Sequence, residues 1–210
     1  MGAPNVHPPK DGSVEIPAQA DVVVVGGGAM GSSIAFHLAE AGVKHVLLIE
    51  RDSLASGSTS RAAGGVRAQF SDELNIAIAL RSLRAFDSFA ERPGVEIDLH
   101  KVGYLFLLDR EQDVAVFEQS VALQNEHGVP SRMVDPQEAK RLSPLIGLDG
   151  VLAASFCPID GHASPESVVQ GYAAGARACQ PCACPPGVFR CLTCASDSAG
   201  VDTEARQEGR

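Results

Sequence analysis

The stretch Ala20–Glu50, ADVVVVGGGAMGSSIAFHLAEAGVKHVLLIE, constrains the fold of this chain more than any other. Asp21–Val25 is a β-branched run of the kind that is buried in a parallel sheet, and it leads directly into a glycine-rich turn. A helix is expected after the turn, with Ile34, Leu38 and Ala41 on its buried face. A second apolar run then returns to the sheet. The order of strand, glycine turn, helix and strand predicts an α/β fold with a parallel sheet.

The glycines of the turn follow the spacing of a dinucleotide-binding fingerprint. Gly26 would permit the tight turn, Gly28 would let a pyrophosphate approach the backbone, and Gly31 would let the helix pack close to the strand. The second strand, Val46–Ile49, is closed by Glu50, about 20 residues past the glycines, where an acid can accept hydrogen bonds from an adenosine ribose. Because these separate conditions are all met, the sequence predicts a bound dinucleotide. The alternative is a glycine turn that serves only strand-to-helix packing.

Composition limits the class of protein. The 210 residues are 45% hydrophobic and 20% charged, which is typical of a soluble globular protein with one large or two small domains. The net charge is −9 and no basic run occurs, so we expect no nucleic-acid partner. No apolar run approaches the roughly 20 residues that a spanning helix needs, and the first residues lack a signal pattern. We therefore expect no membrane span, a cytoplasmic location and a disordered leader over residues 1–19.

The segment Arg51–Ser71 is too small and polar to form a helix or strand throughout. It is either a slack linker or a loop that binds part of a ligand. The run Ser58-Thr59-Ser60-Arg61 offers hydroxyl groups and a cation directly after the nucleotide half-site, where phosphates or a ring must be held. The predicted cofactor-binding residues are Gly26, Gly28, Ala29, Met30, Gly31, Glu50, Arg51, Ser58, Thr59, Ser60, Arg61, Gly64 and Gly65.

The remaining chain alternates between helical and extended patterns. Asp72 is expected to cap an amphipathic helix. VEIDLH (residues 95–100) and YLFLLD (104–109) look like two strands, either a hairpin or one strand broken by Gly103. Further elements are predicted as a helix over Arg110–His127, a capped helix from Asp135-Pro136, a strand over Gly150–Phe156 and a helix from Ser164-Pro165 to about Ala178.

On these residues, the chain resembles the N-terminal half of the D-amino-acid-oxidase-like FAD-dependent oxidoreductases, the family of sarcosine oxidase, glycine oxidase and dimethylglycine dehydrogenase. The matching segments are VVVVGGGAMGSSIAFHLAEAG, Glu50-Arg51, GSTSRAAGGVRAQF, IALRSLRAF, GYLFLL and DGHASPESVVQGYAAGAR. The resemblance implies a flavin on the nucleotide fold and a substrate domain inserted after Glu50. It also implies hydride transfer to the flavin from a C–H beside an amine.

The expected fold class is α/β, with a Rossmann-like FAD-binding parallel sheet interrupted by an inserted mixed α+β substrate-domain segment. The resemblance divides the chain into an FAD-binding segment (20–92), a substrate-domain segment (93–159), a helix returning to the FAD domain (160–178) and an aberrant Cys-rich tail (179–210). The family runs to roughly twice this length, so the fold is expected to be incomplete at its C-terminal end.

Two arginines carry further implications of the resemblance. Members that bind flavin covalently have a histidine where this sequence has Arg61, so the FAD is expected to be non-covalent. Arg67 falls where sarcosine oxidase places an arginine that binds the substrate carboxylate. A guanidinium suits bidentate carboxylate binding. The alternative for Arg67 is a surface arginine on a glycine-rich loop, and no catalytic residue is assigned.

Five of the six cysteines lie within Cys179–Cys194. The pairs Cys179/Cys182 and Cys191/Cys194 resemble zinc knuckles, but the spacing between the pairs is short. A disulfide framework is a second hypothesis, and a shifted reading frame or truncated gene product is the one we favour. We therefore assign no metal site. Cys157 stands apart and is expected to serve packing.

Three functions are compatible with these patterns. The leading hypothesis is an FAD-dependent oxidoreductase that acts on a secondary or tertiary amine of a small amino acid. The second is a non-catalytic remnant that binds adenine nucleotide or a partner subunit. The third, a nicotinamide-dependent dehydrogenase, is disfavoured because it gives no reason for the GSTSRAAGG loop.

Overall fold

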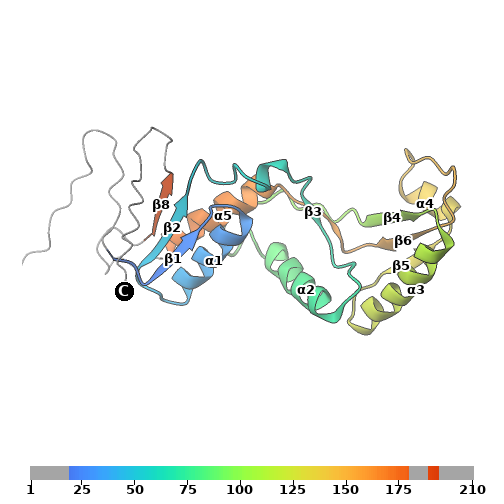
Figure 1. The fold of residues 1–210 in the computed structure, drawn as a ribbon, viewed down its shortest axis with the longest axis horizontal. Helices are drawn as coiled ribbons and strands as arrows, with labels where there is room; N and C mark the ends of the chain where they lie inside the picture. Colours follow the sequence, from blue (N-terminus) through green and yellow to red (C-terminus); the bar gives the residue numbers. More distant parts are fainter. Residues whose placement is uncertain (1–18, 180–188, 194–210) are drawn as a thin grey trace, which may run out of the picture.

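The computed structural model describes residues 19–179 and 189–193, which form two lobes joined by crossing segments (Figure 1). The first lobe is built on a parallel sheet with strand order β1-β2-β8. Its strands are β1 (Val22–Val25), β2 (Val46–Glu50) and β8 (Phe189–Thr193). Helix α1 (Ala29–Glu40) packs on the sheet, and α5 (Pro165–Ala178) packs along α1. The expected α/β fold with a parallel sheet is confirmed.

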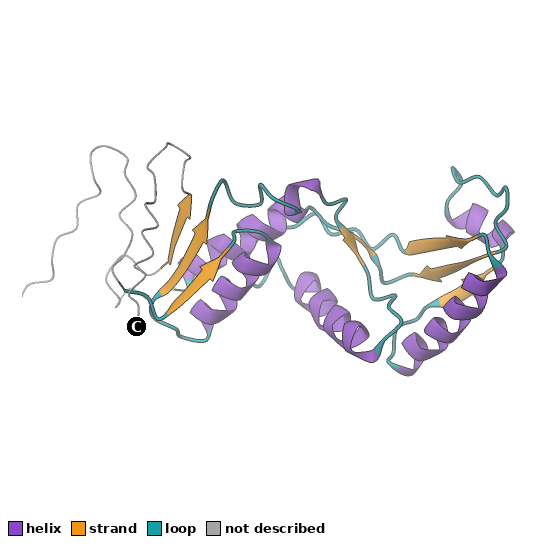
Figure 2. Ribbon diagram, in the orientation of Figure 1, coloured by secondary structure: helices purple, strands orange, loops and turns teal. Residues whose placement is uncertain are grey.

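The second lobe is an antiparallel sheet with strand order β4-β6-β5 and helices packed on it (Figure 2). Its strands are β4 (Tyr104–Leu108), β5 (Arg132–Val134) and β6 (Ala153–Cys157). Helix α3 (Glu111–Glu126) covers the face that carries Phe106, since the ring centroids of Phe106 and Phe117 are 5.4 Å apart. Helix α4 (Pro136–Leu142) covers the opposite face, where Ala139 joins a buried cluster with residues of β5 and β6.

The elements between the two main sheets are mostly short. They are η1, a 3-10 helix (Thr59–Arg61), strand β3 (Gly65–Val66), strand β7 (Gly161–His162) and the longer helix α2 (Glu73–Asp87). Strands β3 and β7 pair in antiparallel fashion, so two of the segments that run between the lobes are tied to each other. No helix in the described part of the chain is long and apolar enough to cross a membrane.

The predicted helix starts are confirmed by their capping hydrogen bonds. The side chain of Asp72 accepts from the backbone N–H of Asn75 at 2.9 Å, and Asp135 accepts from that of Glu138 at 2.7 Å. Ser164 likewise accepts from the backbone N–H three residues on, at 3.3 Å. These caps satisfy N–H groups that a helix leaves free at its start, which is why they could be predicted from local sequence.

The strand predicted over 95–100 is wrong. This segment forms only an isolated bridge between His100 and His162, and β4 pairs with β6 instead of forming a hairpin with it. Asp98 has a φ of 54°, which interrupts an extended conformation. The apolar side chains of this segment pack against helices and not within a sheet. Ile97 enters the core cluster that joins α1 to α5.

The buried face of α1 also differs from the prediction. Ile34 is 47% exposed, whereas Ser32, Ala35 and Phe36 are buried. Small residues dominate the buried face because α1 is pressed between the sheet and α5. Of the three predicted residues, Leu38 packs against the core cluster of the sheet, whereas Ile34 and Ala41 are exposed.

One strand lies within the Cys-rich segment, where the sequence analysis expected none. β8 pairs in parallel with β2, from Val46 opposite Phe189 to Glu50 opposite Thr193. The edge of β2 offers backbone N–H and C=O groups that an extended segment can satisfy whatever its side chains. Cys182 and Cys194 lie outside the described residues, as do residues 1–18 of the expected leader. Cys157 is buried as predicted, and burial raises the pKa of its thiol to about 11.

Candidate cofactor and substrate site

The turn between β1 and α1 is shaped by glycines. Gly26 has a φ of 105°, which side chains disfavour. A Cβ on Gly31 would lie 1.8 Å from the carbonyl oxygen of Gly26, so only glycine fits where the helix crosses the turn. Helix α1 is capped by Gly28, which has no side chain to offer, and its first turn carries no acidic residue. The positive end of the helix dipole is therefore available to an anion.

Glu50 lies against this turn from the end of the neighbouring strand. Its Oε2 accepts a hydrogen bond from the backbone N–H of Gly27 at 2.6 Å, and its Oε1 accepts from that of Asp52 at 3.2 Å. The Gly27 bond is the main reason why the pKa of Glu50 lies below its usual value. Each carboxylate oxygen can accept more than one hydrogen bond, so Glu50 keeps acceptor capacity for a ligand hydroxyl.

The loop after β2 brings a hydroxyl to the same place. Thr59 Oγ1 accepts from the backbone N–H of Ala29 at 3.3 Å and would lie 3.1 Å from a Cβ on Gly28. Ser60 differs, because its hydroxyl donates to the backbone carbonyls of Ser56 and Gly57 at 3.1 Å each. Thr59 therefore faces the glycine turn, whereas Ser60 stabilises its own loop.

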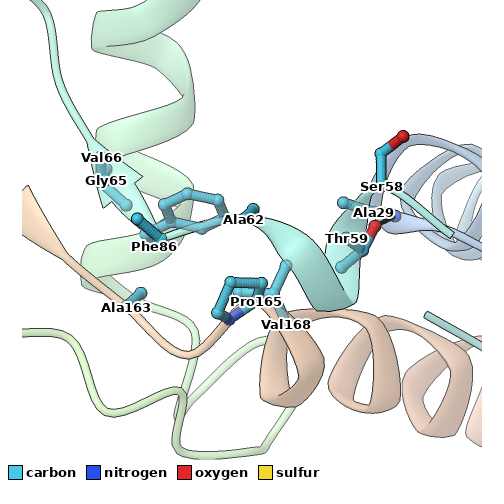
Figure 3. A pocket seen from close by; sticks show the side chains of 12 residues that line it. Ala29, Ser58, Thr59, Ala62, Gly65, Val66, Phe86, Ala163, Pro165 and Val168 are labelled. Atoms are coloured by element: carbon cyan, nitrogen blue, oxygen red, sulfur yellow. Dashed lines mark hydrogen bonds between the residues drawn. The ribbon is translucent and has the colours of Figure 1, made fainter. Parts of the chain in front are cut away.

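A pocket of about 400 Å³ extends from the glycine turn toward the second lobe. Figure 3 shows Ala29, Ser58 and Thr59 at one end and Phe86 with Val66 at the other. Its walls are mostly small or apolar, and they are lined by Ala29, Ser58, Thr59, Ala62, Ala63, Gly64, Gly65, Val66, Phe86, Ala163, Pro165 and Val168. The pocket thus connects the N-terminal end of α1 with the crossing of β3.

The pocket brings together only part of the predicted set. Ala29, Ser58, Thr59, Gly64 and Gly65 line it, whereas Met30, Arg51 and Arg61 are exposed and do not. Sequence reasoning missed the apolar lining, of which Phe86 is a part. Phe86 lies near the end of α2, 27 residues after Thr59 in sequence, so nothing local marked it as a wall of this pocket.

Arg67 follows β3 immediately and lies on the second lobe. Its Nη1 donates to the backbone carbonyl of Gln69 at 2.7 Å. The guanidinium carbon lies 4.5 Å from the ring centroid of Phe70 and 5.2 Å from that of Phe106. Arg67 does not line the pocket, but Val66, its neighbour in sequence, does.

A buried polar network fixes the segment that carries Arg67. Fully buried Asp160 accepts from the backbone N–H of Ala68 at 2.8 Å and from Gln69 Nε2 at 3.2 Å. The same amide nitrogen donates to the carbonyl of Tyr104 at 3.0 Å, and Ser155 donates to Gln69 Oε1 at 2.7 Å. Burial raises the pKa of Asp160 above its usual value. The sequence analysis missed this network, although Asp160 begins the segment DGHASP that carries the family resemblance.

The sequence of residues 21–179 matches the family described as FAD dependent oxidoreductase, and this chain belongs to that family. It is 32% identical over 173 residues to human mitochondrial dimethylglycine dehydrogenase. The aligned region covers 82% of this chain and 20% of that protein. It is 28% identical over 164 residues to the mouse mitochondrial pyruvate dehydrogenase phosphatase regulatory subunit. Here the aligned region covers 78% of this chain and 19% of that protein.

The crystal structure of L-proline dehydrogenase from P. horikoshii has the same fold over most of this chain. The TM-score is 0.75 and the identity 35%, over 85% of this chain and 45% of that structure. The chain therefore spans about a fifth of the length of these curated relatives and less than half of this structure.

Proposed function

We propose that this chain forms the FAD-binding portion and part of the substrate-binding portion of an oxidoreductase. The substrate would be a small amino acid with a secondary or tertiary amine, oxidised by hydride transfer to non-covalent FAD. The observation that carries the proposal is the pocket of about 400 Å³ that begins at the start of α1, where the capping residue, Gly28, has no side chain. An anion-binding site that is continuous with an apolar cavity suits a ligand that has both a pyrophosphate and a flat ring.

The residues present fit the three parts of FAD. The start of α1, with Gly28 and Thr59, would hold the pyrophosphate. Glu50 would accept from the adenosine ribose, because it ends the strand next to β1 and retains acceptor capacity. The walls near Phe86 would bury the ring. The bound flavin would supply the hydride acceptor.

Non-covalent binding is supported by the chemistry of the lining. None of the residues that line this pocket is a histidine, cysteine or tyrosine, the side chains suited to a covalent flavin bond. Arg61 is exposed at the end of η1. We therefore expect FAD to be released by denaturation without remaining attached to the polypeptide.

Arg67 is the proposed anchor for the substrate carboxylate. A guanidinium binds a carboxylate in a bidentate manner that a lysine cannot reproduce. In a protein that binds FAD, Arg67→Lys should raise the dissociation constant for carboxylate inhibitors and leave the FAD content unchanged. If inhibitor binding does not change, or if FAD is lost as well, Arg67 is a loop or cofactor residue.

A second candidate function is nucleotide binding without turnover. It is favoured by the absence of any titratable side chain among the residues that line the pocket. The similarity to a protein named as a regulatory subunit also supports it. The cytoplasmic location stays a prediction, and both curated relatives are named as mitochondrial.

The deciding experiment is a titration of the purified chain with FAD, followed by anaerobic addition of N,N-dimethylglycine. Quenching of flavin fluorescence with saturation, and bleaching of the bound flavin by the amine, would support the oxidoreductase. Binding of ADP or FAD without bleaching would support the second candidate. A chain that binds neither nucleotide contradicts both.

A further inference from the structure

The charge of Arg67 has no ionic partner in the described part of the chain. Its guanidinium is half-buried and takes part in none of the ion pairs found there. The nearby carboxylate of Asp160 is committed to Ala68 and Gln69 instead. The charge of Arg67 acts on Asp160 at a distance, where it opposes the rise in pKa that burial causes, but it forms no ion pair with that carboxyl. A half-buried cation without a directly bound carboxylate attracts an anionic ligand, because desolvation strengthens the interaction.

Two aromatic rings border this cation. The guanidinium carbon lies over the rings of Phe70 and Phe106, at 4.5 and 5.2 Å from their centroids. The rings attract the charge through their faces but accept no strong hydrogen bond, so they do not compete for the N–H donors. Of the five N–H donors, one is directed to the carbonyl of Gln69, and the others stay available to a ligand.

Phe106 is itself held in place. Its ring centroid lies 5.1 Å from that of Tyr104 and 5.4 Å from that of Phe117 on α3. Phe70 is held by its backbone, because its carbonyl accepts from Gln124 Nε2 at 2.9 Å. Asp160 fixes the backbone of Ala68 and the side chain of Gln69 between them. The position of the guanidinium is thus set by groups from strand β4, helix α3 and the segment around Asp160.

We propose that Phe70 and Phe106 are positioning residues for a carboxylate-binding site centred on Arg67. The inference rests on the anchoring role of Arg67 under the proposed function and adds the residues through which that role is achieved. A free arginine side chain loses rotamer entropy when a ligand fixes it. The two rings restrict it before the ligand arrives, so a carboxylate binds without this ordering cost.

The test measures both the position of the guanidinium and its binding of a carboxylate. The full chain is labelled with ¹⁵N-arginine, and the Arg67 Nε–H signal is assigned by its loss in Arg67→Lys. N,N-dimethylglycine is the probe, and the dissociation constant is taken from the shift of this signal. The variants are Phe106→Leu and Phe70→Leu, with Phe106→Tyr as the conservative exchange. Phe156→Leu is the matched control, because Phe156 lies on the opposite face of the same sheet, where the cation over its ring is Arg132 and not Arg67.

We expect Phe106→Leu and Phe70→Leu each to weaken probe binding roughly five- to tenfold. The Arg67 Nε–H signal of the free protein should also move, because a ring current is removed. Phe106→Tyr should keep the dissociation constant within about twofold. Phe156→Leu should also lower the melting temperature, because Phe156 packs in a core cluster of the same sheet, while leaving probe binding unchanged.

The inference and the proposed function fail in different ways. If Arg67→Lys abolishes probe binding but Phe106→Leu and Phe70→Leu do not weaken it, the positioning role is overturned and the anchor stands. Equal weakening by Phe156→Leu and Phe106→Leu also overturns it, since the effect would then be one of general packing. If Arg67→Lys leaves probe binding unchanged, or the unaltered chain gives no probe-dependent shift, the anchor itself is wrong and the inference falls with it. Should Phe106→Leu fail to fold, Phe70→Leu decides.

Discussion

The glycine turn (residues 26–31) and the buried crossing of residues 66–70 with 155–160 are built by opposite means. The turn depends on the absence of side chains, since a Cβ on Gly31 would meet the carbonyl of Gly26. The crossing depends on buried polar side chains, and its hydrogen bonds join Ala68 to Asp160 and Ser155 to Gln69, which are 92 and 86 positions apart. A binding surface made of backbone is thus specified locally, whereas one made of side chains requires the whole chain to fold.

The largest effect is expected where the turn has no room. Gly31→Ala should lower the free energy of unfolding by about 3 kcal/mol or more, because the obstructing atom is a backbone oxygen that cannot rotate away. Gly57→Ala is the matched control, since nothing lies within 4 Å of a Cβ there. Urea denaturation of both variants measures the difference. Equal stability would mean that the turn is not specified by close approach.

The crossing should be the next most sensitive region. Asp160→Ala leaves the backbone N–H of Ala68 buried without its acceptor, which should cost about 2 kcal/mol of unfolding free energy. Asp149→Ala, at an exposed aspartate of the same lobe, should change stability by less than about 0.5 kcal/mol. Denaturant melts of the two variants test whether side-chain hydrogen bonds stabilise this region.

The same aspartate predicts a pH dependence. Because burial raises the folded-state pKa of Asp160, the folded protein keeps the proton at pH values where the unfolded chain has lost it. The contribution of Asp160 to stability should therefore be fully present below its ordinary value of 3.8 and be lost as the pH rises through the folded-state pKa. Asp160→Asn should lack this component. Parallel curves of stability against pH for the two proteins would contradict the raised pKa.

Glu50 tests a side chain that contacts the turn from a distant part of the sequence. Glu50→Gln exchanges a charged acceptor for a neutral one and should weaken FAD binding by about 1 to 3 kcal/mol. It should also loosen the hydrogen bond from Gly27. Glu118→Gln, on exposed α3 surface, is the control. Fluorescence titration gives both affinities, and an unchanged FAD affinity in Glu50→Gln would remove Glu50 from the site.

The smallest effect is expected at an ion pair outside both regions. Arg92 donates from Nε to Glu40 Oε1 at 2.6 Å, and its Nη2 donates to Oε2 of the same carboxylate. The two side chains are 46% and 38% exposed, so solvent screens the pair. Arg92→Ala should cost less than about 1 kcal/mol, and the loss should shrink in high salt. A larger, salt-independent loss would place this pair among the determinants of the fold.

Elements that depend on neighbouring residues could be predicted from the sequence. The helix starts at Asp72, Asp135 and Ser164 follow from caps that span three residues, and the glycine turn follows from a fixed spacing. The buried face of α1 and the segment 95–100 could not be predicted in this way. Their environments are set by α5 and by the core cluster around Ile97, which are distant in sequence.

The candidate site likewise has one part that follows from the local sequence and one part that depends on the tertiary structure. The sequence by itself determined the glycine turn, Glu50 beside it and Thr59 in the following loop, because a parallel strand pair brings the ends of β1 and β2 together. Only the tertiary structure decided that Phe86 and Val168 close a pocket, and that Phe106 lies against Arg67. These contacts join residues from different helices and strands, and no local preference of the backbone encodes which side chains will meet.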